Sequence, residues 1–415
     1  MRELPLVFRA LRHRNFRLFI AGQQISLIGT WMQSVAQQWL VYRLTGSATI
    51  LGLIGFASQI PSFVMGPVGG MAADRANRHR LIILTQVSFM LLAFVLAWLT
   101  LSGRVQIWHI FVLAALGGVV NAFDVPGRQA FIVQMTSKED LMNAIGLNSS
   151  MFNASRVIGP AVAGILVAWL GEGWCFFVNA FSFLAVLLGL MLMRVEAPPP
   201  RRADRSAWVE MLEGLRFVNE QAPIKALMML TAVCSLLGTF SMVLMPIFAA
   251  QILGGGAREL GILMGATGLG ALMGALTLAS RKTVQGLGRW LGAAAAAFGI
   301  LVALFAVSRT LWLSVVLLVP VGFTTMLQMA ATNTLIQVMV PDDLRGRAMS
   351  VYSMMFMGMM PFGSLLAGKL AEFWGAPLTV AAGGIGCTVA GVIFLVSLPR
   401  LRPQTQFLID QASQT

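Results

Sequence analysis

Three long runs of apolar, uncharged residues limit what this chain can fold into. The runs at 47–73, 81–101 and 176–193 carry few or no charged side chains. A helix needs about 20 apolar residues to cross the hydrocarbon core of a bilayer, and each run is long enough. Because 57% of the 415 residues are hydrophobic, a water-soluble protein could not cover so much apolar surface. We therefore expect an all-α polytopic membrane protein.

Apolar stretches along the whole chain predict 12 transmembrane helices. The predicted spans are 16–41, 47–73, 81–101, 107–130, 142–169, 173–193, 224–251, 259–280, 287–307, 311–336, 346–373 and 376–398. Most connections are short, whereas the one after the sixth span is proline-rich and charged. Its second part places Trp208, Met211, Leu212, Leu215 and Val218 at helical spacing, which predicts an amphipathic helix on the cytoplasmic surface. The expected domains are an N-terminal six-helix bundle (1–193), a cytoplasmic linker with that helix (194–223) and a C-terminal six-helix bundle (224–415).

The two halves of the chain resemble each other in sequence. "QMTSKEDLMNA" (134–144) and "QVMVPDDLRGR" (337–347) share Gln, Asp and Leu at matching positions, and each follows the fourth span of its half. "GPAVAG" (159–164) has a related sequence in "FGSLLAG" (362–368). Duplicated six-span halves are typical of transporters built as two pseudo-symmetric bundles around a central site.

The net charge of +13 arises from basic residues in alternate connecting segments. The remaining connecting segments hold only Arg43, Arg104, Arg258 and Arg309. Cytoplasmic loops carry the excess of Lys and Arg in membrane proteins, so this asymmetry predicts that both termini are cytoplasmic. The same asymmetry accounts for the basic net charge, since these residues orient the protein in the lipid bilayer. We therefore expect no nucleic-acid partner.

One acidic side chain stands among arginines in the loop after the second span. The stretch "GGMAADRANRHR" (69–80) contains Gly70, Asp74, Arg75, Arg78 and Arg80. It resembles the signature loop of the major facilitator superfamily, which implies a cytoplasmic gate in which Asp74 engages the start of the eleventh span, here 347–352. Glycine would allow close helix packing there. A plain basic membrane anchor is the competing interpretation, and it explains the arginines only.

A second pattern lies in the fifth span, where Gly146, Ser155, Gly159, Pro160 and Gly164 follow one another at characteristic spacing. It resembles the antiporter motif of exporters in this superfamily, with Ser155 and Ala163 in place of two glycines. Ordinary close packing of helices would select the same small residues.

Three longer stretches make the resemblance more specific. They are "FRLFIAGQQISLIGTWMQSVAQQWLVYRLTGSA", "NAFDVPGRQAFI" and "NAIGLNSSMFNASRVIGPAVAGILV". They are similar to the enterobactin-exporter branch, whose members export siderophores, drugs or, in some cases, metal ions from bacterial inner membranes. The resemblance implies efflux from the inner membrane and leaves the substrate open.

Charged side chains inside predicted spans are costly and therefore point to function. Asp124 and Arg128 lie four residues apart in the fourth span and can pair along one helix face. Arg156 lies near the middle of the fifth span, where it could approach Asp124. These three residues are our candidates for proton coupling. A permanently ionised structural pair would account for the same charges.

The substrate cavity should be lined by the first helix of each three-helix group. The polar and aromatic candidates are Gln23, Thr30, Trp31, Ser34 and Gln37 in the first span, Thr231, Ser235 and Thr239 in the seventh, and Thr325, Gln328 and Thr332 in the tenth. Ser and Thr can instead bond to their own helix. A lining with little fixed charge suits small amphipathic molecules.

Several further classes of protein find no support in the sequence. The Met-rich stretch "YSMMFMGMMPF" (352–362) does not form one helix face, so we expect no metal site, although a metal-ion exporter stays a competing hypothesis. No catalytic triad, HExxH or phosphate-binding GKS/T motif occurs, so we expect neither an enzyme nor an ATP-driven pump.

Together these features predict a monomeric exporter of a small-molecule substrate, a siderophore or drug, that works by alternating access. We expect transport to be driven by the proton gradient and to need no cofactor. An uptake permease and a lipid or lysolipid transporter are competing hypotheses within the same fold.

Overall fold

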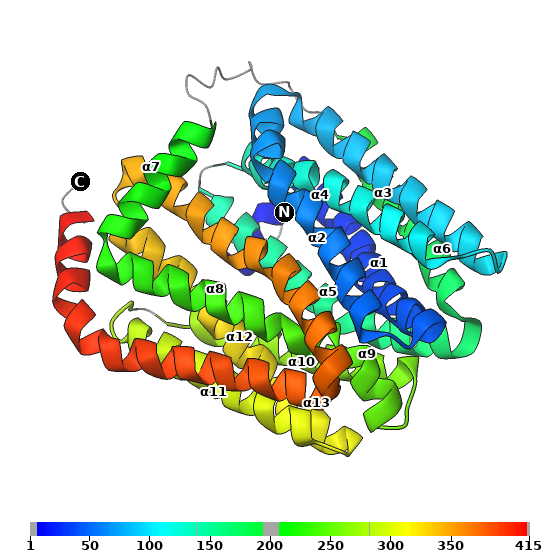
Figure 1. Ribbon diagram of the computed structural model, residues 1–415. Coiled ribbons are helices and arrows are strands. Elements are labelled where there is room, and N and C mark those ends of the chain that lie inside the picture. The colour runs from blue at the N-terminus through cyan, green and yellow to red at the C-terminus, as the bar shows by residue number, and fades with distance from the viewer. Residues whose placement is uncertain (1–5, 138, 194–206, 282, 413–415) are drawn as a thin grey trace. The chain divides into compact units, whose positions relative to one another are not determined.

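The computed structural model describes residues 6–137, 139–193, 207–281 and 283–412, and every regular element in these ranges is helical (Figure 1). The elements are η1 (Leu6–Arg12), α1 (Arg14–Thr45), α2 (Ala48–Arg75), α3 (Arg78–Leu101), α4 (Ile107–Met135), α5 (Leu141–Leu170), α6 (Glu172–Met191), α7 (Ala207–Glu220), α8 (Ala222–Val243), α9 (Met245–Ile247), η2 (Phe248–Ile252), α10 (Ala257–Ala279), α11 (Leu287–Val307), α12 (Leu311–Met339) and α13 (Asp342–Ala412). This is the expected all-α polytopic architecture.

Within these described ranges, 10 helices are long and apolar enough to cross a membrane. The long helix α1 is not among them, because its Gln, Ser and Thr side chains lower its hydropathy. The last of the 10, Leu344–Ile409, contains the predicted eleventh and twelfth spans together. Its helix α13 runs on to Ala412, past the predicted end of the twelfth span at 398.

Glycines with positive φ mark the turn between the fifth and sixth spans in both halves. Gly171 has φ 87° between α5 and α6, and Gly375 has φ 77° inside α13. A residue with a Cβ is strained at such φ values, whereas glycine adopts them without strain. Glycine therefore allows the chain to turn between the two helices. The matching positions of the two glycines are a structural sign of the internal repeat.

The chain divides into two compact units, one formed by 1–44, 60–204 and 256–265, the other by 45–59, 205–255 and 266–415. This division differs from a simple cut at the linker, because the first part of α2 belongs to the second unit and the first part of α10 to the first. The boundaries proposed at 193 and 224 stay a prediction.

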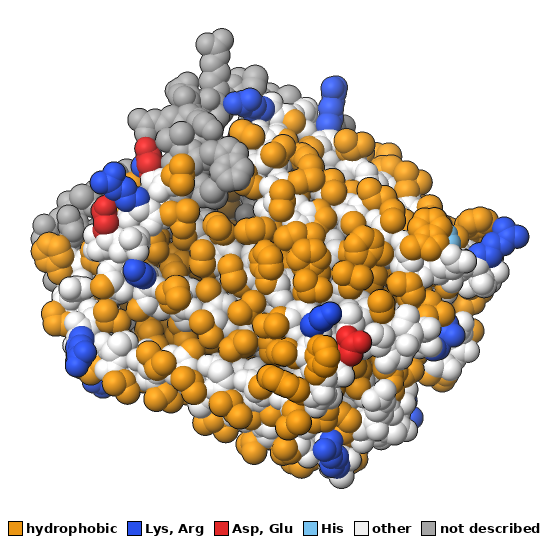
Figure 2. Space-filling model, viewed as in Figure 1, with side chains coloured by type: hydrophobic (Ala, Val, Ile, Leu, Met, Phe, Trp, Pro, Cys, Tyr) orange, Lys and Arg blue, Asp and Glu red, His pale blue; other side chains and the backbone are white. Residues whose placement is uncertain are grey.

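Each unit is held together by apolar side chains between its helices. In the first unit, Phe16 and Phe19 of α1 pack with Ile82 of α3 and Phe131 of α4, and all four are buried. In the second unit, Phe248 stacks on Phe305 of α11 with ring centroids 4.6 Å apart. Hydrophobic side chains also cover most of the face seen in Figure 2, with Lys and Arg mainly toward its edges. A bilayer can shield such a surface, whereas water cannot.

The predicted amphipathic helix corresponds to α7 in the second unit. Val218 is buried and Leu212 is exposed, while the side chains of Trp208 and Met211 lie outside the described part. Gly214 meets the start of α13 so closely that a Cβ would come within 2.8 Å of the carbonyl oxygen of Arg347. The helix α7 therefore packs against protein as well as offering an exposed face.

Candidate transport site

Asp124 of α4 lies in a polar network inside the first unit. Its side chain is 1% accessible. The Thr85 hydroxyl and the Gln86 side-chain amide, both from α3, each donate a hydrogen bond of 2.8 Å to Asp124 Oδ1. Arg128 Nη2 lies 2.6 Å from the second carboxylate oxygen, Oδ2. The predicted pairing along one face of α4 is therefore present, with two partners from α3 added to it.

The position of Asp124 along α4 places it well inside the helix. At about 1.5 Å per residue it lies roughly 26 Å from the first residue of α4 and roughly 16 Å from the last. A charge at the centre of a membrane-spanning helix costs about 2.5–3.5 kcal/mol on insertion scales unless it is compensated. Arg128 and the two hydrogen-bond donors supply that compensation, and the side chain of Arg128 remains 25% exposed.

Arg156 of α5 is placed differently from Asp124. Its guanidinium carbon lies 5.8 Å from the ring centroid of Trp31 in α1. Among the described residues no carboxylate forms an ion pair with it, and the ion-pair partner of Asp124 is Arg128. The three proton-coupling candidates thus fall into two separate groups, Asp124 with Arg128 and Arg156 with Trp31.

The antiporter-like motif forms a close crossing between α1 and α5. A Cβ on Gly159 would overlap the Cβ of Trp31, so only glycine permits this approach. Ser155 is fully buried and accepts a hydrogen bond of 2.8 Å from Gln24 Nε2. Pro160 is buried inside α5.

The two remaining glycines of the motif have different surroundings. A Cβ on Gly146 would meet nothing within 4 Å. A Cβ on Gly164 would lie 3.2 Å from Arg258 Cα of α10. Close packing therefore explains Gly159 and Gly164, and it leaves Gly146 without a structural reason in this arrangement.

At the loop after α2, the close-packing glycine is not the one expected. A Cβ on Gly69 would overlap the backbone of Ala122 in α4, whereas one on Gly70 would meet no described atom within 4 Å. The motif predicts close packing at Gly70, whereas in the structure Gly69 is the residue that packs against α4.

The charged residues of the same loop are mostly at the surface. Asp74 is 62% exposed and lies 3.9 Å from Arg78, whose Nε donates to the carbonyl of Ala73 at 3.1 Å. Arg75 and Arg80 are exposed. In the second unit, Arg347, the first residue of the predicted partner region 347–352, pairs with Glu213 of α7 at 3.0 Å. The gate remains a prediction.

The cavity candidates differ in exposure. Thr30 is exposed, and Trp31, Ser34, Gln37 and Thr325 are half-buried. Gln23, Thr231, Ser235, Thr239, Gln328 and Thr332 are buried. Four hydroxyls, those of Thr30, Thr231, Thr239 and Thr325, donate to carbonyl groups of their own helices. Those four hydroxyls follow the common pattern for membrane helices, and the lining role of the whole set stays a prediction.

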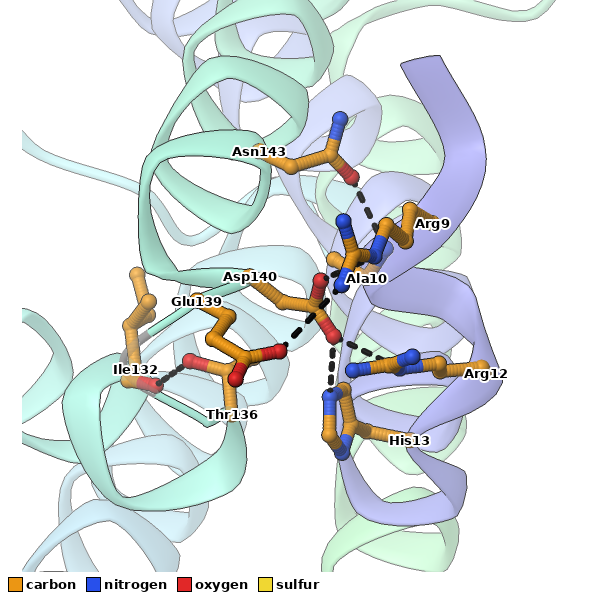
Figure 3. Close-up of polar contacts among 9 residues, drawn as sticks. All are labelled: Arg9, Ala10, Arg12, His13, Ile132, Thr136, Glu139, Asp140 and Asn143. Carbon is orange, nitrogen blue, oxygen red and sulfur yellow. Dashed lines mark hydrogen bonds and ion pairs between the residues drawn. The ribbon is translucent and has the colours of Figure 1, made fainter. Parts of the chain in front are cut away.

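Sequence reasoning missed an ion-pair cluster at the end of the first unit (Figure 3). Asp140, between α4 and α5, binds Arg9 at 2.9 Å and both Arg12 and His13 at 2.7 Å. Arg9 also pairs with Glu139 at 3.3 Å. The segment that precedes α1 is thus fastened to the α4–α5 loop. We call these five residues the N-terminal clasp.

Two effects oppose each other at Asp140. Burial under its partners raises the pKa of the carboxyl, while the hydrogen bond from His13 and the positive charges of Arg12 and Arg9 lower it. The lowering effects win, so the pKa lies below the usual value of 3.8. Asp140 belongs to the repeated motif "QMTSKEDLMNA", but its partners lie more than 120 residues away in sequence and no local pattern marks them.

Two further contacts were not expected from the sequence. Thr85 and Gln86 are adjacent polar residues in a largely apolar span, and this pair was a local signal for the contacts that α3 makes with Asp124. In the second unit the free, buried cysteines Cys234 of α8 and Cys387 of α13 lie near each other, although the sequence separates them widely.

Solved structures with the same fold come from several transporters. A bacterial homologue of the human lysosomal transporter Spinster aligns with a TM-score of 0.67 and 17% identity, over 96% of this chain and 97% of that one. A POT family transporter in complex with a thioalcohol-conjugated peptide aligns with a TM-score of 0.74 and 12% identity, over 94% and 96%. At such identities the likeness establishes the fold alone.

Curated relatives match most of the chain at low identity. They include the staphyloferrin A transporter of Staphylococcus aureus, 26% identical over 91% of this chain and 95% of the relative. The multidrug efflux pump Tap of Mycolicibacterium fortuitum is 28% identical over 90% of this chain and 93% of the relative. The enterobactin exporter EntS of Escherichia coli is 25% identical over 94% of this chain and 93% of the relative. The family model described as transmembrane secretion effector matches residues 7–410. The chain is therefore a multi-pass membrane transporter, and it belongs to the transmembrane secretion effector family of the major facilitator superfamily.

Proposed function

We propose that this protein is a proton-coupled exporter of small amphipathic molecules, a siderophore or a drug, that works by alternating access. The observation that carries the proposal is the Asp124 network, a titratable carboxyl group deep in α4 with a flexible cationic side chain, Arg128, beside it. The direction of transport is supported by relatives that are named as an efflux pump and an exporter.

The coupling step follows from the contacts of Asp124. In its charged form the carboxylate holds Arg128 at 2.6 Å and accepts from Thr85 and Gln86. A proton on Asp124 removes the negative charge, so the attraction for Arg128 is lost and its side chain is free to turn toward its exposed side. The two protonation states therefore differ in charge and in contacts between α3 and α4. Because of this difference, binding of a proton can shift the equilibrium between two conformations of the protein.

We propose that the protein works in the bacterial inner membrane, with both termini in the cytoplasm. The excess of basic residues in alternate loops supports this orientation. Protons flowing inward would supply the energy, without a cofactor, and a monomer with two bundles would be the working unit.

Everted membrane vesicles test the direction and the coupling together. With an imposed proton gradient, a siderophore such as enterobactin or a dye such as fluorescein should accumulate inside vesicles that contain the wild-type protein. Asp124→Asn should abolish gradient-driven accumulation while membrane insertion stays normal. Glu220→Gln is the matched control, because it neutralises an acid that is 57% exposed on α7. Unimpaired coupling in Asp124→Asn would disprove the coupling role, and accumulation only in right-side-out vesicles would indicate an uptake permease.

A further inference from the structure

Arg156 is a cation inside a membrane-spanning helix without an anionic partner among the residues that the structure describes. It lies near the middle of α5, roughly 21–22 Å from either end of that helix at about 1.5 Å per residue. Its one charge-related contact within the described ranges is the ring of Trp31 at 5.8 Å. Intramembrane cations normally pair with an acid or with backbone carbonyls, so a lone one needs an explanation.

The helix crossing brings Arg156 to Trp31. Gly159, three residues further along α5, lets the Cβ of Trp31 approach the α5 backbone. The indole then lies along α5 toward the preceding turn, where the guanidinium group of Arg156 covers it. On the same face, the ring of Phe152 meets the indole edge-on, with centroids 5.7 Å apart and an interplanar angle of 72°.

Arg156, Trp31 and Phe152 lie beside an interhelical hydrogen bond and are partly exposed. The hydrogen bond from Gln24 to Ser155 joins α1 and α5 beside them at 2.8 Å. Arg156 and Trp31 are half-buried, and Phe152 is 45% exposed. Each of the three side chains thus keeps part of its surface accessible, beside a hydrogen bond that joins α1 to α5.

The rest of the first unit, in its described part, does not neutralise Arg156. Asp124, the one acid buried inside α4, is compensated by Arg128. The ring of Trp31 attracts the cation through its quadrupole but supplies no net negative charge. A purely structural role would leave one positive charge uncompensated in a low-dielectric region, which an anionic ligand would correct.

We propose that Arg156, Trp31 and Phe152 form the anion-recognition point of the substrate site, and that the transported molecule is an organic anion with a planar aromatic group. The guanidinium group can hold a carboxylate or a catecholate oxygen pair through two parallel hydrogen bonds. The rings of Trp31 and Phe152 would pack against the aromatic part. This inference rests on the proposed export function, and it narrows the substrate from any amphipathic molecule to an aromatic anion.

Two dyes with the same xanthene skeleton and opposite charge provide the test. Fluorescein is an anion at pH 7.5, and rhodamine 123 is a cation. Fluorescence anisotropy measures binding of each dye to the purified full-length protein in detergent, so the result does not depend on transport. We expect tighter binding of fluorescein than of rhodamine 123 to the wild type. Arg156→Gln should weaken fluorescein binding by about ten-fold or more and leave rhodamine 123 binding unchanged or stronger.

Further variants separate recognition from folding. Arg156→Lys keeps the charge and should retain part of the fluorescein affinity, and Trp31→Phe should retain more affinity than Trp31→Leu. Lys369→Gln on α13 is the control, because it removes the same charge from an exposed position. The melting temperature of each variant is measured in parallel.

The outcomes distinguish the two proposals. Selective fluorescein binding that depends on Arg156 supports the recognition site even if vesicles show no export, in which case the proposed function fails alone. Equal dye binding by wild type and Arg156→Gln, or a preference of the wild type for rhodamine 123, overturns the recognition site, whatever the vesicles show.

Discussion

Arg128 Nη2 lies 2.6 Å from Asp124 Oδ2, one helical turn away on α4, while Thr85 and Gln86 of α3 donate hydrogen bonds to the other carboxylate oxygen, Oδ1. The ion pair lies within one helix, and the hydrogen bonds connect two helices. Removal of one charge therefore changes both the stability of α4 and its attachment to α3.

The first prediction concerns the stability of this pair. Arg128→Gln leaves a buried carboxylate without its cation, so it should destabilise the protein by about 3–5 kcal/mol. Asp124→Asn/Arg128→Gln removes both charges and should recover most of the loss, because amides can share the hydrogen bonds with Thr85 and Gln86. Thermal unfolding followed by fluorescence-detected gel filtration measures both variants. A double variant no more stable than Arg128→Gln would contradict the pairing.

A second prediction concerns the crossing of α1 and α5. Gly159→Val should separate the helices, because its side chain would overlap Trp31, and it should reduce the yield of folded protein several-fold. Gly146→Ala is the control within the same motif, since its Cβ meets nothing within 4 Å and alanine favours helix. Yields are compared by gel filtration of detergent extracts, and equal losses in both variants would show that packing does not explain the motif.

The third prediction distinguishes the roles of Gly69, Gly70 and Asp74 at the end of α2. Gly70→Ala should be tolerated, whereas Gly69→Val should reduce folding, because only Gly69 faces the backbone of Ala122. Asp74→Asn should leave insertion intact and impair transport cycling. Measurements of expression and of vesicle transport for the three variants test these roles, and full activity of Asp74→Asn would reduce the loop to an anchor.

The N-terminal clasp gives a prediction about pH. Its partners lower the pKa of Asp140 below 3.8, so the stability that Asp140 contributes is fully present above the unfolded-state value and is lost as the pH falls through the folded-state pKa. The melting temperature of Asp140→Asn should thus be below that of the wild type from about pH 5 to 7.5, and the two should converge only at a pH below about 3.8.

The control for the clasp is Glu139→Gln, because the Glu139 side chain is 76% exposed and its pair with Arg9 is long. This variant should change the melting temperature little. If the difference between Asp140→Asn and the wild type disappeared between about pH 5 and 7, the clasp would titrate in the physiological range and the prediction would be wrong.

The membrane fold, the internal repeat and the ion pair of Asp124 with Arg128 could be predicted from the amino-acid sequence alone. These features depend on local properties: the length of apolar runs, the recurrence of short motifs and the spacing of four residues along a helix. Helix ends were less well predicted, and α13 passes the expected end at 398 because proline alone did not end it.

The meeting of groups from different helices was set by the tertiary structure. It joined Thr85 and Gln86 to Asp124 and placed Arg156 over Trp31. It assigned close packing to Gly69 instead of Gly70 and fastened Arg9, Arg12 and His13 to Asp140. The rotation of each helix about its axis selects these contacts. In a chain that is apolar on nearly all sides, hydrophobic periodicity carries little information about that rotation, and close approach at glycines fixes it instead.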